Sequence, residues 1–328
     1  MERNNSKLQG ILAAMGLMVL ILDSQLALDG ARSGIDLCIR TVIPALFPFF
    51  VLSSMLTGSL ADSSPSSGIK FCKKLGIPAA GSSVLVPAVL GGYPVGAKCV
   101  GDLYQNRQIS KREAEQLLTF CSNAGPSFIF GMVSGFFPER KMVWLLWLIH
   151  LYSAFLTAVV IADSSEESIL SQAKKESERQ SILLSSAKTM VQVCCWVILF
   201  RILIRFLKEW FLWAFPVWLQ VWLTGFLELT NGCCELLQIT DTSQRFVLCS
   251  GMLAFGGVCV LFQTASVIGG LSVVSYIKGK LLQTVFSLVI SSAIVTGYGT
   301  VVTVVLSLIL VFFRKIRNRY SNLRLVSV

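Results

Sequence analysis

Hydrophobic residues are grouped along this chain in long runs that short polar segments separate, a pattern that predicts membrane-spanning helices. Runs long enough to cross a bilayer cover residues 8–28, 35–60, 114–137, 142–162, 189–207 and 246–268. A final run, residues 281–313, would be about 50 Å long as one helix, well over the roughly 30 Å hydrocarbon core. Gly297 and Gly299 supply a turn that divides this run into two short spans. The pattern therefore predicts an all-α polytopic membrane protein with about eight transmembrane helices.

The first run has two interpretations. Arg3 and Lys7 precede it, and a cleavage site after Ala27 would fit a secretory signal peptide. The apolar part is long enough to span the bilayer, which favours an uncleaved N-terminal anchor.

One apolar run is too short to cross and ends in a broken stretch. Residues 76–90 are followed by Gly91-Gly92-Tyr93-Pro94-Val95-Gly96-Ala97-Lys98, in which glycine and proline interrupt helical pairing. Broken backbone at membrane depth is tolerated only where it is buried in protein or lines a cavity. We therefore interpret the stretch as the tip of a re-entrant hairpin beside a polar site. A phosphate-binding loop is not supported, because Ala97 precedes Lys98 and Cys99 follows it.

Four further interruptions are expected. A second short hairpin follows residue 207 and is broken at Pro216 and again at residues 228–232. Two complete spans are interrupted near their centres, at residues 122–127 and at residues 254–257. In the first of these, Pro126 lacks an N–H and leaves a carbonyl that needs a partner or a ligand. The same span contains a Gly-x-x-x-Gly pattern at residues 131–135, which permits close helix contact.

The two halves of the chain show the same order of elements: a span, a short broken hairpin, an interrupted span and a closing span. Gly96 lies 24 residues before Phe120, and Gly232 lies 23 residues before Phe255. Because each unit crosses the membrane three times, the second has the opposite orientation, so we expect an inverted repeat. Such paired interruptions point to a secondary transporter with its site near the midplane. The expected parts are an anchor (1–34), a first repeat (35–162), a cytoplasmic connector (163–188), a second repeat (189–300), and a last helix with a basic tail (301–328).

The composition agrees with a membrane protein. Of 328 residues, 54% are hydrophobic and 14% are charged, and the mean hydropathy is +0.70, whereas soluble domains have roughly 25% charged residues. The formal net charge of +10 comes from short loops and the tail. This distribution indicates orientation by positive loops, with both termini in the cytoplasm, and gives no basic folded domain for nucleic acid.

Few residues suggest metal or catalytic chemistry. The ten cysteines include no C-x-x-C pair, so we assign no metal, cofactor or disulfide framework. The only histidine, His150, is expected to form a hydrogen bond between packed helices, with a proton relay as the alternative. The chain has no HExxH motif and no paired catalytic carboxylate motif, so we do not expect an enzyme.

Helix N-termini at the interruptions carry partial positive charge and free N–H groups, which suit an anion. Candidate binding residues for a small, anionic solute are Gly92, Tyr93, Pro94, Gly96, Lys98, Ser122, Asn123, Thr230, Asn231, Gly256 and Gly257. Lys98 would add a full charge there, or would instead extend to the cytoplasmic face. Glu228 is the candidate for a coupling proton or Na⁺, because a carboxylate at membrane depth is costly unless it is used or paired. Pairing with Arg201 or Arg205 would explain it structurally.

Four motifs in order resemble the sporulation integral membrane protein YlbJ family, which belongs with the nucleoside-recognition (Gate) domain proteins. The motifs are residues 92–98, residues 121–129, Glu228-x-Thr230-x-Gly232 and residues 254–257, and the similarity covers roughly residues 35–300. The resemblance implies paired re-entrant hairpins around a central site, as in the concentrative nucleoside transporters. It also implies a role in endospore formation and in moving dipicolinate, a small aromatic dicarboxylate.

Two functions are carried forward. The first is a secondary transporter in the cell membrane for a small, anionic solute, either a dicarboxylate or nucleoside-like. The second is a non-transporting sporulation membrane factor that binds a solute or a partner protein. A scaffold has no need to keep Asn123, Glu228 and Asn231 at membrane depth, which favours transport. The lipid bilayer is the expected surrounding, and assembly into a homo-oligomer stays open.

Overall fold

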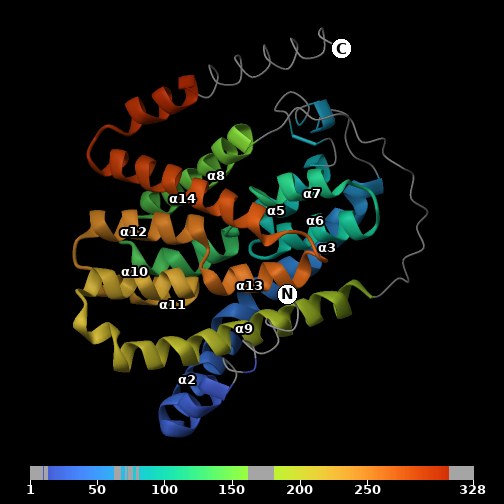
Figure 1. Cartoon of the computed structure of the whole chain (residues 1–328). Helices are drawn as coiled ribbons and strands as arrows, with labels where there is room; N and C mark the ends of the chain where they lie inside the picture. Colours follow the sequence, from blue (N-terminus) through green and yellow to red (C-terminus); the bar gives the residue numbers. More distant parts are fainter. Residues whose placement is uncertain are drawn as a thin grey trace.

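The computed structural model is helical throughout the part of the chain that it describes, residues 10, 14–62, 68–70, 72, 77–78, 81–161 and 181–309 (Figure 1). Five helical segments there are long and apolar enough to cross a membrane: Ser24–Leu52, Arg140–Ile161, Ile182–Trp210, Thr242–Val267 and Val273–Val295. The chain is therefore a multi-pass membrane protein. Most of the expected connector and the basic tail lie outside the described residues.

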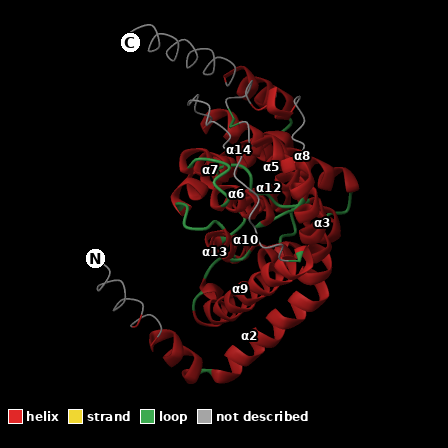
Figure 2. Ribbon diagram, turned by 90° about the vertical axis from the view of Figure 1, so that its right-hand side faces the viewer, coloured by secondary structure: helices red, strands yellow, loops and turns green. Residues whose placement is uncertain are grey.

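The N-terminal helices run without a loop from Ser24 to Asp62. They comprise α2 (Ser24–Leu37), the π-helical turn η1 (Cys38–Val42) and α3 (Ile43–Asp62). The expected boundary between residues 34 and 35 falls inside this helix, so the separation of two spans there was wrong. The reason is packing against α9 (Ile182–Trp210), beside which α2 runs in Figures 1 and 2. A Cβ built on Gly30 would lie only 2.9 Å from the Cα of Ile202.

The first predicted hairpin forms. Helix α5 (Gly81–Leu90) and helix α6 (Val95–Gln105) pack on each other and are joined by residues 91–94. Gly92 adopts φ +75°, a conformation that glycine reaches at little cost. With ten and eleven residues, each helix is only about 15–17 Å long, too short to cross a bilayer. The predicted break in the helix is confirmed.

Both predicted interruptions of complete spans are also confirmed. Helix α7 (Lys111–Leu118) ends before a non-helical stretch, and the chain resumes as η2 (Ser127–Met132) and η3 (Val133–Phe136). Helix α12 (Thr242–Phe255) is separated from α13 (Val258–Val267) by Gly256 and Gly257. Each of these two glycines has a positive φ, +83° and +92°, which other residues rarely adopt.

The second hairpin has both predicted breaks, at Pro216 and at Glu228, but the second break is shorter than expected. A turn, η4 (Leu212–Ala214), leads from α9 into α10 (Val217–Leu227), which is followed by α11 (Leu229–Glu235) and η5 (Leu236–Gln238). Pro216 begins α10, and the chain leaves helical geometry between α10 and α11 only at Glu228. Residues 229–232 are helical because the side chain of Glu228 caps them.

The closing helix of the second half begins earlier than predicted. Helix α14 (Val273–Val295) starts eight residues before the expected position because Ser272 caps its N-terminus by accepting a hydrogen bond from Val274 N. The turn at Gly297 is confirmed, and a short helix, Gly299–Ile309, follows it. The first of the two expected helices is therefore longer than predicted, has spanning length by itself and contains Lys278 and Lys280.

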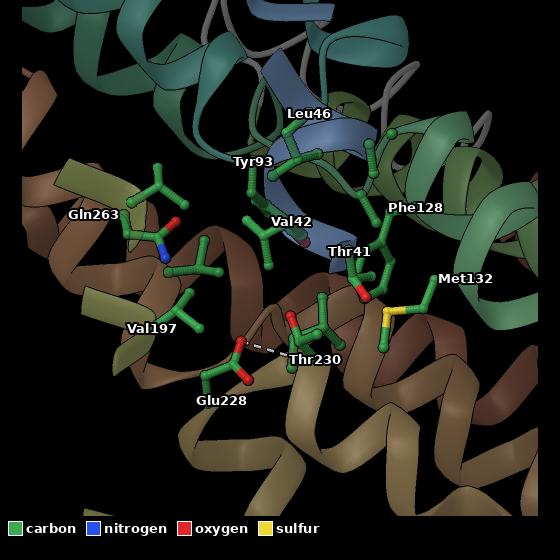
Figure 3. A pocket seen from close by; sticks show the side chains of 16 residues that line it. Thr41, Val42, Leu46, Tyr93, Phe128, Met132, Val197, Glu228, Thr230 and Gln263 are labelled. Carbon is green, nitrogen blue, oxygen red and sulfur yellow. Dashed lines mark hydrogen bonds between the residues drawn. The ribbon is translucent and has the colours of Figure 1, made fainter. Parts of the chain in front are cut away.

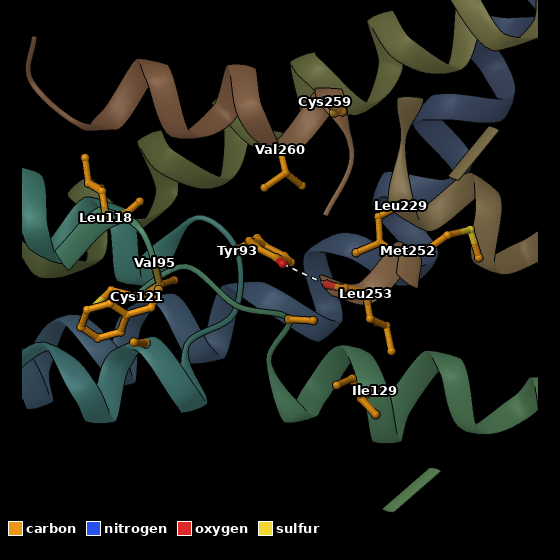
Figure 4. Close-up of a cluster of buried hydrophobic side chains, with 14 of the residues drawn as sticks. Tyr93, Val95, Leu118, Cys121, Ile129, Leu229, Met252, Leu253, Cys259 and Val260 are labelled. Carbon is orange, nitrogen blue, oxygen red and sulfur yellow. Dashed lines mark hydrogen bonds between the residues drawn. The ribbon is translucent and has the colours of Figure 1, made fainter. Parts of the chain in front are cut away.

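The two halves interlock at the centre of the molecule. Helix α14 packs against α12 and also against α8 (Arg140–Ile161) and α7 of the first half. Helix α13 packs against α6, and α3 packs against α5 and α9. Both interruptions and both hairpin tips are thereby enclosed by longer helices, and Figure 4 shows the buried side chains that fill the space between them.

Candidate functional site

The two hairpin tips line one cavity of about 50 Å³ (Figure 3). Tyr93 comes from the first tip, and Glu228 and Thr230 come from the second. The other lining residues are Thr41, Val42, Ala45, Leu46, Ala124, Gly125, Phe128, Met132, Val193, Val197, Leu229, Val260 and Gln263. Broken backbone from both halves of the chain is therefore brought to one place.

Tyr93 connects the first tip to the interruption of the second half. Its hydroxyl donates to the carbonyl oxygen of Leu253 at 3.0 Å, as Figure 4 shows. A Cβ built on Gly256 would lie 3.0 Å from Cζ of the tyrosine ring. The ring therefore occupies the space that the missing side chain of Gly256 leaves.

Each tip also packs, backbone against backbone, on the interruption of its own half. A Cβ on Gly125 would lie 3.0 Å from the Cα of Gly92. In the second half, a Cβ on Gly257 would lie 3.2 Å from the amide nitrogen of Leu229 and 3.3 Å from the carbonyl oxygen of Leu227. The same contact recurs at corresponding places, in the order of elements that the sequence repeat predicts.

Glu228 is buried and holds the end of helix α11. One carboxylate oxygen accepts from the amide of Thr230 at 3.0 Å, and the other accepts from the amide of Asn231 at 2.7 Å. The protein's own carboxylate thus uses the N–H groups expected to attract an anion at this tip. Arg201 donates instead to the side-chain oxygen of Asn231 and, at 3.0 Å, to Ser33.

The polar side chains at the first interruption mostly form hydrogen bonds with backbone groups that the break in the helix leaves unpaired. Asn123 donates to the carbonyl of Phe120 at 2.7 Å and accepts from Gln283 at 3.0 Å. His150 is buried, and its Nε2 accepts from the amide of Ala124 at 3.0 Å. The hydrogen-bonded packing role predicted for the histidine is therefore confirmed. Ser122 is buried without a hydrogen-bond partner of normal geometry among the described residues.

The remaining predicted residues lie outside the cavity lining. Pro94 begins helix α6, and Gly96 packs directly on the carbonyl group of Cys121. Lys98 forms an ion pair with Asp102, one turn along the same helix, at 2.8 Å, and its side chain is 22% exposed. The sequence predicted that the charge of Lys98 lies beside the binding site. In the structure, this charge is paired with Asp102 on α6.

Lys280 is the central residue that sequence reasoning missed. It is 1% exposed, and its ammonium group donates to the hydroxyl of Tyr93 at 3.0 Å and to Oε1 of Gln283 at 2.7 Å. In the sequence it lies between the hydrophobic runs 246–268 and 281–313, outside either predicted span. A usable signal was present, because Lys280, Gln283, Ser287 and Ser291 recur at helical spacing and share a buried face of α14.

A second cavity of about 320 Å³ lies along α9 and α2. Arg201, Arg205 and Lys208 line it from one face of α9, together with Asp29 and Glu235. Lys208 and Glu235 form an ion pair at 2.5 Å. Because Arg201 also binds the side chain of Asn231, this basic cavity reaches the second hairpin.

These features define the class of the protein: an all-helical, multi-pass membrane protein in which two broken hairpins and two interrupted helices surround a small cavity. The chain is 27% identical over 345 aligned positions to the sporulation integral membrane protein YlbJ of Bacillus subtilis strain 168, covering 87% of this chain and 83% of that protein. This similarity supports the assignment to the YlbJ family that the motifs predicted. No family model matches the chain, and no solved structure matches it.

Proposed function

We propose that the protein is a secondary transporter that moves a small, anionic solute through the membrane of a spore-forming bacterium. The observation that carries this proposal is the shared cavity, in which Tyr93 of one hairpin meets Glu228 and Thr230 of the other. Broken helices at corresponding positions of two halves are the arrangement from which secondary transporters build a midplane site. The family relative is a sporulation protein, which supports the cellular setting.

The size of the cavity defines the conformational step that transport requires. About 50 Å³ accommodates a few water molecules, whereas small-molecule sites have about 300–1,000 Å³. The tips must therefore separate before a solute binds. Because each tip packs on the interruption of its own half, we propose that each hairpin moves together with that interruption, as inverted repeats do in alternating access.

The basic cavity along α9 supports an anionic cargo. Its three cations exceed its two carboxylates, and its volume of about 320 Å³ falls in the range of small-molecule sites. We propose that an anion collects there before it reaches the hairpins. Dipicolinate is the first solute to test, because the resemblance to the YlbJ family implies it, and a nucleoside is the second.

The alternative function is a sporulation membrane factor that binds a solute or partner without transporting it. The small volume of the central cavity favours this alternative, because a permanently closed site would serve assembly only.

Purified protein in liposomes distinguishes the two functions. We expect accumulation or exchange of labelled dipicolinate or nucleoside, and a large loss of flux in Glu228→Gln. Glu139→Gln is the matched control, since Glu139 is exposed and, among the described residues, pairs with Lys141. Correctly folded wild-type protein that moves neither solute would exclude transport of these cargoes and leave the binding factor.

A further inference from the structure

The ammonium group of Lys280 is buried where α14 meets the first hairpin tip. The described residues that contact it are neutral: it donates to Tyr93 and Gln283 and lies 4.8 Å from the centre of the tyrosine ring. No aspartate or glutamate in the described ranges forms an ion pair with it. A buried charge is costly unless an opposite charge accompanies it, so this position favours an anion that is not part of the protein.

Three buried hydroxyl groups mark the same region. The hydroxyl of Tyr276 lies next to those of Ser122 and Thr264. All three residues are at most 2% exposed, and none of the three hydroxyls completes a hydrogen bond of normal geometry within the described chain. Lys280 lies 5.9 Å from the ring centre of Tyr276. These three buried hydroxyls contact one another beside a cation, so they can supply hydrogen-bond donors to a ligand with acceptor oxygens.

Tyr93 separates this region from the central cavity. Its side chain lines the cavity, whereas its hydroxyl accepts from Lys280 and donates to Leu253 (Figures 3 and 4). Displacement of the ring, which sits at the hairpin tip, would bring the ammonium group to the cavity. Tyr93 is therefore both the residue that separates Lys280 from the cavity and the residue whose displacement would connect them.

We propose that Lys280 binds a carboxylate of the solute, with the hydroxyls of Ser122, Thr264 and Tyr276 as further donors, and that Tyr93 screens it while the tips are closed. The inference rests on the proposed function because it names the chemistry that selects the cargo. The ligand class is a small organic carboxylate, and the uncharged carboxamide of the same shape is excluded.

Binding to the purified protein tests this assignment without transport. Affinity for isophthalate and for its uncharged analogue isophthalamide would be measured in detergent by titration, with unfolding temperature as a second readout. Lys280→Gln keeps a hydrogen-bond donor and removes the charge, and Lys280→Met removes both. Lys278→Gln is the matched control, because Lys278 lies two residues away on the exposed side of α14.

We expect wild type and Lys278→Gln to bind isophthalate and not isophthalamide, and both Lys280 variants to bind isophthalate about 30-fold more weakly or worse. Since removal of an unpaired buried charge relieves its desolvation, Lys280→Met should unfold without ligand at or above the wild-type temperature. Wild type that binds neither compound, or both equally, would overturn the assignment. Equal isophthalate affinity in wild type and either Lys280 variant would do the same.

The flux assay separates this inference from the proposed function. Charge-dependent binding through Lys280 with no flux in liposomes would leave the assignment standing and remove transport. Flux that is unchanged in Lys280→Gln would leave transport standing and remove the assignment.

Discussion

Substitution of Gly96 by alanine tests the joint between the first hairpin tip and the interruption on which it packs. A Cβ at this position would overlap the carbonyl oxygen of Cys121 and would lie 2.7 Å from its carbonyl carbon and 3.1 Å from the Cα of Ala88. Carbon atoms in favourable contact lie about 3.5–4.0 Å apart. Helix α6 must therefore shift by about 1 Å, because the atoms in the way are backbone atoms that cannot rotate aside.

Two opposing effects determine how much stability the Gly96→Ala protein loses. Overpacking of a tight contact costs about 1–3 kcal/mol, and a backbone obstacle places this site at the upper end. Alanine regains up to about 1 kcal/mol of helix propensity. We expect the Gly96→Ala protein to lose about 2 kcal/mol of stability.

Gly131→Ala is the matched control. A Cβ there would meet no atom within 4 Å, so the variant should be as stable as wild type or gain up to about 1 kcal/mol. Unfolding of the detergent-solubilised proteins, followed by tryptophan fluorescence, would show Gly96→Ala several degrees below Gly131→Ala, and dipicolinate flux would fall in the first variant alone. Equal unfolding temperatures for the two variants would refute the close approach of α6 to the interruption.

Three further changes probe other parts of the structure. Glu228→Gln should lower stability by about 1–2 kcal/mol in the same unfolding assay, because the cap of α11 loses its charge; an unchanged unfolding temperature would contradict the capping role. Arg245 donates to the carbonyls of Ile239 and Phe136, so Arg245→Met should cost about 2–3 kcal/mol, while the exposed Arg140→Met should not. Gly34→Ile should detach α2 from α9, because a Cβ at Gly34 already lies 3.0 Å from the Cα of Ile198; cleavage by added protease that stays as slow as in wild type would argue against this contact.

The interruptions could be predicted from the sequence because they depend on local chemistry. Glycine and proline disturb helical pairing whatever surrounds them, so the breaks at residues 91–94, 119–125 and 256–257 overlap the stretches that the pattern indicates. Tyr93 and Thr230, both candidate binding residues, line one cavity. The break predicted at residues 228–232 is shorter in the structure, because the carboxylate of Glu228 caps a helix that begins at Leu229.

The partners of charged residues could not be predicted in this way, because they depend on contacts between distant segments. Lys98 was placed near a helix end by spacing alone, whereas its partner Asp102 decides where its charge is used. Lys280 falls between two predicted spans in the sequence, whereas α14 begins at Val273 and includes it. Likewise, a Cβ at Gly131 or Gly135 would meet nothing nearby, and the close helix contact forms instead at Gly30 and Gly34.

The carboxylate of Glu228 makes the two hairpins chemically unequal in spite of their matching architecture. Helix α11 carries its own tethered counter-ion, so an arriving anion would compete there with a group that never leaves. The first tip has no capping carboxylate: Pro94 offers no capping side chain, and the ammonium group of Lys280 donates to Tyr93. A molecule with negative charge at one end would accordingly be held in a single direction, charged end towards Tyr93 and neutral end towards Thr230.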